Sequence, residues 1–285
     1  MKRILVTGAT GFIGSYLIPE LLRAGHQVIA TSAHEARARL QPWFPQVVYL
    51  PCDLSRLNPD LDYFREFGQP DSAIHLAWEG LPNYKASFHE EVNLPRQYAF
   101  LTRLINGGLR DLTVLGTCLE YGMREGCLSE AMQAAPTIPY AKAKDTLRRQ
   151  LEAYRGRHPF VFRWVRLFYM YGRGQNPNSL FSQLDKAVAD HEPVFNMSGG
   201  EQVRDYLPVE SVAVYLIKLA NQDRVVDIIN CCSGEPVTVK QMVEAHLRRS
   251  GAEIALNLGY YPYPDYEPFR FWGDPSKLKT ILENE

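Results

Sequence analysis

The sequence predicts an α/β fold in which a doubly wound parallel sheet carries helices on both faces. Short apolar runs rich in β-branched residues, typical of strands buried on both sides, alternate along the chain with stretches of helical periodicity. Strands that alternate with helices pair in parallel and place the helices on both faces of the sheet. The composition agrees, because 46% of the 285 residues are hydrophobic and 22% are charged, as in ordinary globular proteins.

The first fifty residues predict a strand, a helix and two further strands. Residues 4–6 form the first predicted strand, and residues 12–24 carry apolar side chains at helical spacing up to Gly25. The second and third strands are expected at residues 28–30 and 47–50. Later strands are expected at residues 72–77, 112–116, 161–168 and 226–231.

The charge balance and the cysteine spacing exclude several other classes of protein. With 31 Lys and Arg against 32 Asp and Glu, the chain offers no basic face of the size that nucleic-acid binding needs. The five cysteines lack the paired spacing of a metal site, so no metal is expected. No apolar run reaches the ~20 residues of a membrane helix. We expect a cytoplasmic protein without a nucleic-acid or membrane partner.

A glycine-rich turn follows the first predicted strand. Gly8, Gly11 and Gly14 lie three residues apart and open the first predicted helix. In such a turn one glycine permits a tight bend, the next lets backbone N–H groups approach a pyrophosphate, and the third lets helix and strand pack closely. The helix N-terminus adds partial positive charge for the phosphates. A turn without a ligand is the alternative, but the strand–helix context favours a dinucleotide site of the Rossmann type.

The glycine turn resembles the TGxxGxxG fingerprint of the extended short-chain dehydrogenase/reductase family, which includes nucleotide-sugar epimerases, dehydratases and reductases. Other segments are similar in the family's order: Asp53-Leu54 resembles its adenine-contacting acidic-Leu pair, residues 75–77 its HLAA segment, Asn93 its helix asparagine, and residues 204–209 its RDYIHV segment. The resemblance implies a cofactor site that includes Gly8, Thr10, Gly11, Phe12, Ile13, Gly14, Asp53, Leu54, Leu76, Ala77, Tyr140 and Lys144.

The pattern of the sequence changes near Tyr171. Gly172, Gly174 and Pro177 interrupt the chain, and residues 260–266 are rich in aromatic residues and proline. We expect a dinucleotide-binding Rossmann domain over residues 1–170 and a smaller substrate-binding lobe over residues 171–285, with some segments returning to the main sheet. By analogy with the family, we expect a homodimer formed through the helices that carry Asn93 and Tyr140.

The residues after the second strand bear on the choice of cofactor. An NAD-selective site needs a carboxylate there to hold the ribose 2′-hydroxyl, and the chain has none before Glu35. Ser32, His34 and either Arg37 or Arg39 could instead hold a 2′-phosphate, which the planar arginine fork suits. NADP is therefore the expected cofactor, and NAD is the alternative.

Three side chains are the predicted catalytic residues. Tyr140 and Lys144 form a Tyr-x-x-x-Lys pair that a helix places on one face, and a nearby ammonium would favour the phenolate. The resemblance implies that Lys144 also binds the nicotinamide ribose. Residues 116–122 are similar to the family's S-[ST]-x-x-x-Y-G segment, which puts Thr117 at its catalytic hydroxyl position and replaces the preceding serine by Gly116. Thr117 would hold the substrate oxygen while Tyr140 exchanges the proton.

Departures from the family pattern narrow the expected reaction. The family's 4,6-dehydratases carry Asp and Glu where this chain has Cys118 and Leu119, and leucine cannot move a proton. Epimerases acting at C3 or C5 use a cysteine at the position of Leu119 and a later histidine, and no histidine lies between His158 and His191. Two reactions remain: NADPH-dependent reduction of a 4-keto (deoxy)sugar nucleotide, which we favour, and C4 epimerisation with tightly bound NAD. A non-catalytic dinucleotide-sensing or RNA-binding relative is a third, less favoured hypothesis.

The expected substrate is a nucleotide sugar. Arg204 keeps the family's arginine and is the candidate for the diphosphate, unless it forms an ion pair with an acid such as Asp205. Tyr169 replaces the asparagine that commonly touches the sugar diphosphate in the family. Trp78, after the fourth strand, and Asn178 are the other candidates for substrate binding.

Overall fold

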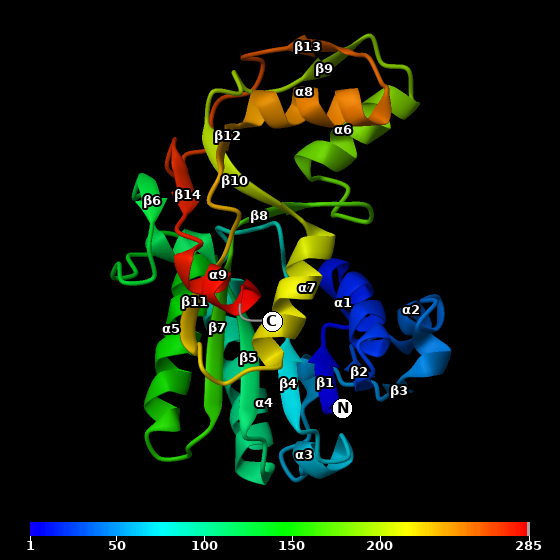
Figure 1. Ribbon diagram of the computed structural model, residues 1–285, viewed down its shortest axis with the longest axis vertical. Coiled ribbons are helices and arrows are strands. Elements are labelled where there is room, and N and C mark those ends of the chain that lie inside the picture. The colour runs from blue at the N-terminus through cyan, green and yellow to red at the C-terminus, as the bar shows by residue number, and fades with distance from the viewer. Residues whose placement is uncertain (284–285) are drawn as a thin grey trace.

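A parallel sheet forms the centre of the protein. The computed structural model describes residues 1–283, and within them seven strands pair in the order β11-β7-β5-β4-β1-β2-β3 (Figure 1). Their bounds are β1 Arg3–Thr7, β2 Gln27–Thr31, β3 Val48–Tyr49, β4 Ser72–His75, β5 Asp111–Thr117, β7 Val161–Leu167 and β11 Asp227–Cys231. The doubly wound parallel sheet of Rossmann type expected from the sequence is confirmed, and the third and fourth strands are each two residues shorter than predicted.

The strand order reverses at β1 and opens a crevice at the carboxyl ends of the strands. The chain proceeds outward through β2 and β3 on one side of β1 and through β4 and β5 on the other. Ligands of open α/β sheets bind outside the carboxyl ends at such a switch point. Residues that follow β1, β4 and β5 therefore meet at one edge of the sheet.

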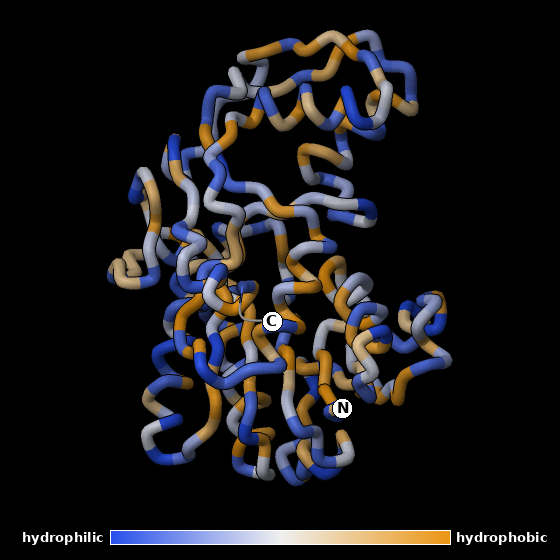
Figure 2. The backbone as a smooth tube through the Cα atoms, in the orientation of Figure 1, coloured by the Kyte–Doolittle hydropathy of each residue, from blue (hydrophilic) through white to orange (hydrophobic). Residues whose placement is uncertain are grey.

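Helices cover both faces of the sheet because its strands are apolar on both sides. Within β1, Ile4 and Val6 pack into one apolar cluster and Leu5 into the other, as the two-residue period of a strand requires. One face is covered by α1 Phe12–Arg23, α7 Val209–Ala220 and α9 Ser276–Leu282, and the other by α3 Tyr63–Glu66, α4 Leu94–Gly107 and α5 Pro139–Arg155. Figure 2 shows hydrophobic residues running along the strands between these layers.

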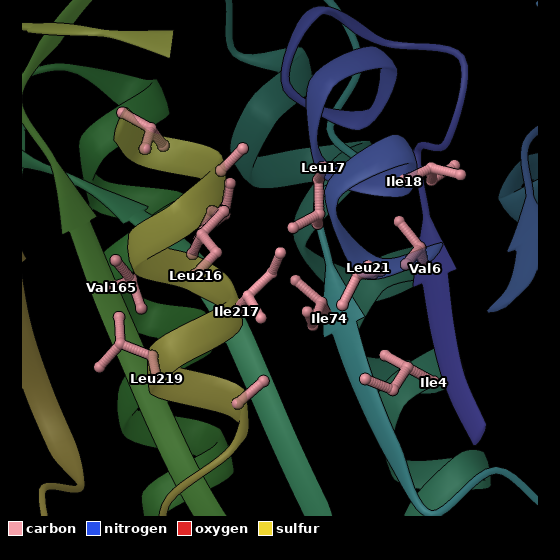
Figure 3. Packing of buried hydrophobic residues seen from close by; sticks show 14 of the residues in the cluster. Ile4, Val6, Leu17, Ile18, Leu21, Ile74, Val165, Leu216, Ile217 and Leu219 are labelled. Atoms are coloured by element: carbon pink, nitrogen blue, oxygen red, sulfur yellow. The ribbon is translucent and has the colours of Figure 1, made fainter. Parts of the chain in front are cut away.

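The packing of α1 against α7 links the beginning of the chain to its later half. Leu17 and Leu21 of α1 face Leu216 and Ile217 of α7 above the sheet (Figure 3). Leu17, Leu21 and Leu216 are completely buried. The later half therefore contributes to the main unit through α7, α9 and β11.

The remaining elements after residue 168 lie beyond the carboxyl ends of the sheet, at the top of Figure 1. Strands β8, β10 and β12 form one small sheet, β9 pairs with β13, and β14 pairs with β6. Their bounds, with those of the other helices, are α2 Glu35–Arg39, β6 Gly126–Leu128, β8 Tyr169–Tyr171, α6 Leu180–Ala189, β9 Val194–Asn196, β10 Val203–Pro208, β12 Pro236–Thr238, α8 Val239–Ser250, β13 Ala255–Asn257 and β14 Phe271–Gly273. Residues 284 and 285 of the predicted lobe lie outside the described residues.

Leu216→Ala is expected to lower the free energy of unfolding by about 3 kcal/mol, because it opens a cavity between α7 and the sheet. Val214→Ala on the same helix is the control, since Val214 is 38% exposed and its truncation should cost less than about 1 kcal/mol. Urea denaturation of both variants measures the difference. Equal losses would show that the α1–α7 interface does not carry this part of the stability.

Candidate functional site

The glycine turn is shaped for close approach of a ligand and of the backbone. A Cβ on Gly8, whose φ is +66°, would lie 2.8 Å from Ala77 N, and a Cβ on Gly14 would lie 2.4 Å from Ala9 O. Gly8 thus brings β1 close to the segment after β4, and Gly14 lets α1 pack against its own turn. Helix α1 begins after Gly11, and no side chain of residues 1–283 caps that end. Its first N–H groups are therefore available to an anion.

A cavity of about 410 Å³ extends from this turn along the carboxyl ends of β1, β2 and β4. Most of the predicted cofactor residues line it: Gly8, Thr10, Gly11, Ser32, His34, Arg37, Leu54, Leu76 and Ala77. The sequence analysis missed Arg96 and Gln97 of α4, which also line it. The glycine cradle, the open helix end and the elongated cavity fit a dinucleotide.

Six predicted cofactor residues do not line this cavity: Phe12, Ile13, Gly14, Asp53, Tyr140 and Lys144. Gly14 has the packing role described above, and the Asp53 carboxylate accepts a hydrogen bond from Ser55 N at 2.8 Å and caps the short turn Leu54–Arg56. Phe12 begins α1, and Ile13 lines a second, neighbouring cavity.

The two arginines after β2 have different surroundings: Arg37 lines the cavity, and Arg39 forms an ion pair. Arg39 contacts Glu35 at 2.6 Å, so these opposite charges satisfy each other one helical turn apart. Arg37 lines the cavity together with His34. The Ser32 hydroxyl lies 2.9 Å from the Tyr49 hydroxyl. Of the two arginines considered from the sequence, Arg37 is the one that lines the cavity.

Thr117, Tyr140 and Lys144 come together in the second cavity, of about 270 Å³, which adjoins the first. Thr117 ends β5, and Tyr140 and Lys144 occupy the first turns of α5. Pro139 starts this helix at a position where its missing N–H costs nothing. The three side chains are 7%, 7% and 3% exposed, and a hydrogen bond joins the hydroxyls of Thr117 and Tyr140.

Burial dominates the charge states of this trio. It raises the pKa of Tyr140, although the hydrogen bond to Thr117 acts in the opposite direction. It also lowers the pKa of Lys144 to about 7, against the opposing effect of the Glu120 carboxylate. The Lys144 amine donates to Leu115 O at 2.8 Å instead of to the phenol. The acidification of Tyr140 by Lys144 that the sequence suggested is thus not produced by the polypeptide alone.

Glu120 supports the structure of the site and was not predicted from the sequence. Its carboxylate is fully buried and accepts hydrogen bonds from Thr117 N at 2.9 Å, Trp164 Nε1 at 2.9 Å and Arg166 Nε at 2.8 Å. Thr117 and Glu120 form a capping box at the turn after β5. The pattern Thr-x-x-Glu was a usable signal for this box, whereas the partners on β7 were not visible from sequence.

The rest of the second cavity is largely aromatic. Trp78, Tyr84, Tyr169 and Tyr266 line it, together with Cys118. Trp78, a candidate for substrate binding from the sequence, is thus a lining residue of the cavity that holds the trio. Burial raises the pKa of Cys118, so it remains a thiol at neutral pH.

The predicted diphosphate residue Arg204 is engaged in an ion pair. Its guanidinium contacts Glu267 at 2.6 Å, and Glu267 also accepts a hydrogen bond from Tyr169. Asp205, the partner considered from the sequence, instead accepts hydrogen bonds from Ser233. Arg204 and Glu267 both line a third cavity, of about 250 Å³, within the C-terminal elements. An anion that binds Arg204 there would compete with Glu267.

Asn178 lies away from the trio. Its backbone N–H donates to the side chain of Asn176 at 2.9 Å and its carbonyl accepts from Gln183, as part of the turn before α6. Asn178 is exposed and is not among the residues that line the three cavities described above. Gln175, three residues earlier, lines the second cavity instead.

The described residues hold no group of three or more His, Cys, Asp or Glu side chains placed to bind a metal ion. Among the same residues, no helix is both long and apolar enough to cross a membrane.

Lys144→Met is expected to stabilise the ligand-free protein while abolishing turnover. Burial lowers the pKa of Lys144 from 10.5 to about 7, so the charged amine opposes folding below pH 7, and this cost fades as the pH rises toward 10.5. We expect the free energy of unfolding to rise by about 2 kcal/mol at pH 6, after the lost hydrogen bond to Leu115 is counted, and by less at pH 10. Urea denaturation at both pH values measures this, and a loss of stability at pH 6 would contradict it.

Comparison with known proteins identifies the family. The model of the NAD dependent epimerase/dehydratase family matches residues 4–232. The chain is 27% identical over 280 residues to a dTDP-6-deoxy-L-talose 4-dehydrogenase (NAD(+)) of Aggregatibacter actinomycetemcomitans, covering 95% of this chain and 98% of the relative. It is 26% identical over 325 residues to a UDP-glucose 4-epimerase of Neisseria meningitidis serogroup C, covering 99% and 92%.

Solved structures share the fold over the whole chain. The structure of MoeE5 in complex with UDP-glucuronic acid and NAD is 26% identical, has a TM-score of 0.81 and is matched over 99% of this chain and 92% of its own. The family expected from the sequence is confirmed by these matches. The chain belongs to the NAD dependent epimerase/dehydratase family of extended short-chain dehydrogenases/reductases.

Proposed function

We propose that the protein interconverts a 4-hydroxyl and a 4-keto group on a nucleotide-linked sugar, acting as a 4-ketoreductase of a 4-keto-6-deoxy sugar or, in reverse, as a 4-dehydrogenase. The observation that carries this proposal is the meeting of Thr117, Tyr140 and Lys144 in a cavity that adjoins the glycine-rich crevice. The relative named as a dTDP-6-deoxy-L-talose 4-dehydrogenase supports both the carbon and the class of sugar.

The side chains have distinct roles in this reaction. A bound nicotinamide supplies or accepts the hydride at the sugar carbon. Thr117 holds the sugar oxygen, and Tyr140 donates a proton to it or removes one. When the cofactor is bound, a protonated Lys144 in the same cavity would add a positive charge that favours the phenolate. The aromatic walls of the cavity keep water from the reacting groups.

The residues next to Thr117 argue against dehydration of the substrate. Cys118 is buried with a raised pKa, and Leu119 is 8% exposed and apolar. Neither can serve as a general acid or base at neutral pH. Oxidation and reduction at one carbon need only the trio and the cofactor.

C4 epimerisation is the second candidate function. The relative named as a UDP-glucose 4-epimerase and the structure of MoeE5 with bound NAD both favour it. An epimerase returns its hydride to the other face of the same ketone, so it turns over without added cofactor. This requirement separates the two candidates in an assay.

For the cofactor, the relatives support NAD more strongly than the NADP expected from the sequence. We propose that the chain uses NAD(H) and that Arg37 lets the same pocket accept NADP(H). Glu35 lies near this end of the pocket, but its carboxylate is paired with Arg39, so it does not repel a 2′-phosphate.

We also propose that two parts of the chain bind the two ligands separately, as expected from the sequence. Residues 1–170 would bind the dinucleotide, and residues 171–285 would bind the nucleotide sugar through Arg204 and the third cavity. The outer faces of α4 and α5 would join two copies, and the half-buried Tyr98 and Tyr154, whose rings meet edge to face at 6.2 Å, would lie at that interface. The five cysteines are free of disulfides, which supports a reducing, cytoplasmic setting.

Incubation with NADH or NADPH and a panel of dTDP- and UDP-linked 4-keto-6-deoxy sugars is expected to consume the reduced cofactor. Tyr140→Phe should lower the rate at least about 100-fold, because it removes the proton donor. Tyr215→Phe is the matched control and should keep the wild-type rate, because this half-buried tyrosine of α7 lines none of the three cavities. Turnover of a nucleotide sugar without added cofactor, with NAD retained through purification, would favour the epimerase instead. Failure of every substrate, or full activity of Tyr140→Phe, would refute the proposal.

Arg37→Ala is expected to weaken NADPH binding at least about 10-fold relative to NADH, because a charge-assisted contact to the 2′-phosphate is lost. Arg39→Ala is the control, since Arg39 is already paired with Glu35. Titration of both nucleotides by fluorescence measures the ratio of the two dissociation constants. If Arg37→Ala leaves that ratio unchanged, Arg37 does not meet the 2′-phosphate.

A further inference from the structure

Trp78 lies between the two adjoining cavities and against the trio. It follows β4 and lines both the cavity at the glycine turn and the second cavity, which holds the trio. The Lys144 amine lies 4.0 Å from the centre of its ring, within range of a cation–π interaction. The Tyr140 ring meets it edge to face at 5.9 Å. One indole therefore contacts two of the three candidate catalytic residues.

A buried histidine fixes the orientation of this indole. Trp78 Nε1 donates to His89 Nδ1 at 3.1 Å, and the two rings stack at 6.2 Å with 24° between their planes. His89 Nε2 lies 2.9 Å from Asn83 O, so it carries the proton and Nδ1 is left to accept. Asn93 donates to the Glu79 carbonyl at 2.9 Å and lies 3.3 Å from His89 Nδ1. The loop after β4 is thereby held on the turn His89–Asn93, which precedes α4, by directed contacts.

The other titratable groups around Lys144 give its charge little direct support. Burial lowers the pKa of His75 on β4 to about 3 and lowers that of His89, so both are neutral at physiological pH, and Tyr140 on the same helix is a neutral phenol. The Glu120 carboxylate after β5 favours the ammonium but is bound to Arg166. Among the described residues, the carbonyl oxygen of Leu115 and the face of Trp78 are the groups in direct contact with the amine that stabilise its positive charge.

We propose that Trp78, oriented by His89, is a positioning residue whose ring face keeps Lys144 charged and in place beside Tyr140. Its effect on turnover rests on the function proposed above, whereas its effect on Lys144 does not. The loss of a desolvated cation–π contact should shift the titration of Lys144 by about one pH unit toward lower pH. If the reaction needs the charged amine, the alkaline limb of the pH–rate profile moves in the same direction.

The test measures Lys144 without relying on activity. Lysine labelled with ¹³C at Cε is followed by NMR over a pH titration of the ligand-free protein, and Lys144→Met identifies the resonance. We expect the Lys144 titration midpoint to fall by about one unit in Trp78→Leu and by less in Trp78→Phe, which keeps a ring but loses the bond to His89. Trp272→Leu, a change in β14 away from Lys144, should leave the midpoint where it is.

The pH–rate profiles of the same variants form the second readout. A lowered midpoint without any turnover of nucleotide sugars would support the role of Trp78 and refute the proposed function. An unchanged or raised midpoint in folded Trp78→Leu would overturn the role of Trp78, as would an equal fall in Trp272→Leu. Should Trp78→Leu fail to fold, Trp78→Phe decides: a midpoint equal to that of the wild type overturns the role.

Discussion

The candidate site depends on the buried carboxylate of Glu120. It binds the backbone of Thr117 at the end of β5 and the side chains of Trp164 and Arg166 on β7. A buried charge of this kind is tolerated only when it is paired and fully hydrogen-bonded. The sharp turn after β5, and with it the direction of the Thr117 hydroxyl, therefore rests on a contact between two neighbouring strands of the sheet.

Close to Glu120 lie Lys144 and Tyr140, two buried groups whose charged forms are destabilised by burial. Burial lowers the pKa of Lys144 to about 7 and raises that of Tyr140. The shift brings the pKa of Lys144 close to neutral pH, as is common for groups in active sites, whereas it moves the pKa of Tyr140 away from neutral pH. Burial of these titratable groups at the carboxyl ends of β4 and β5 thus lowers the stability of the interior where the reaction is proposed to occur.

The sequence predicted the fold and much of the site because both leave short-range signals. Alternating strands and helices, the glycine spacing before α1, and the four-residue spacing of Tyr140 and Lys144 are local patterns that the sheet then brings together. Contacts across long stretches of chain were not predictable. Glu120 meets Trp164 44 residues later, and Arg204 meets Glu267 63 residues later. The pKa of Tyr140 was misjudged for the same reason, because spacing alone does not show that Lys144 donates to Leu115 O.

The path of the transferred hydrogen shows whether the protein reduces the ketone at C4 of the sugar. The protein would be incubated with a 4-keto-6-deoxy nucleotide sugar and with NADH that carries deuterium on the reactive face of C4 of the nicotinamide ring. The product would then be examined by NMR. We expect deuterium at C4 of the sugar, with the new hydroxyl proton drawn from solvent. A product that carries deuterium at another carbon, or none at all, would contradict it.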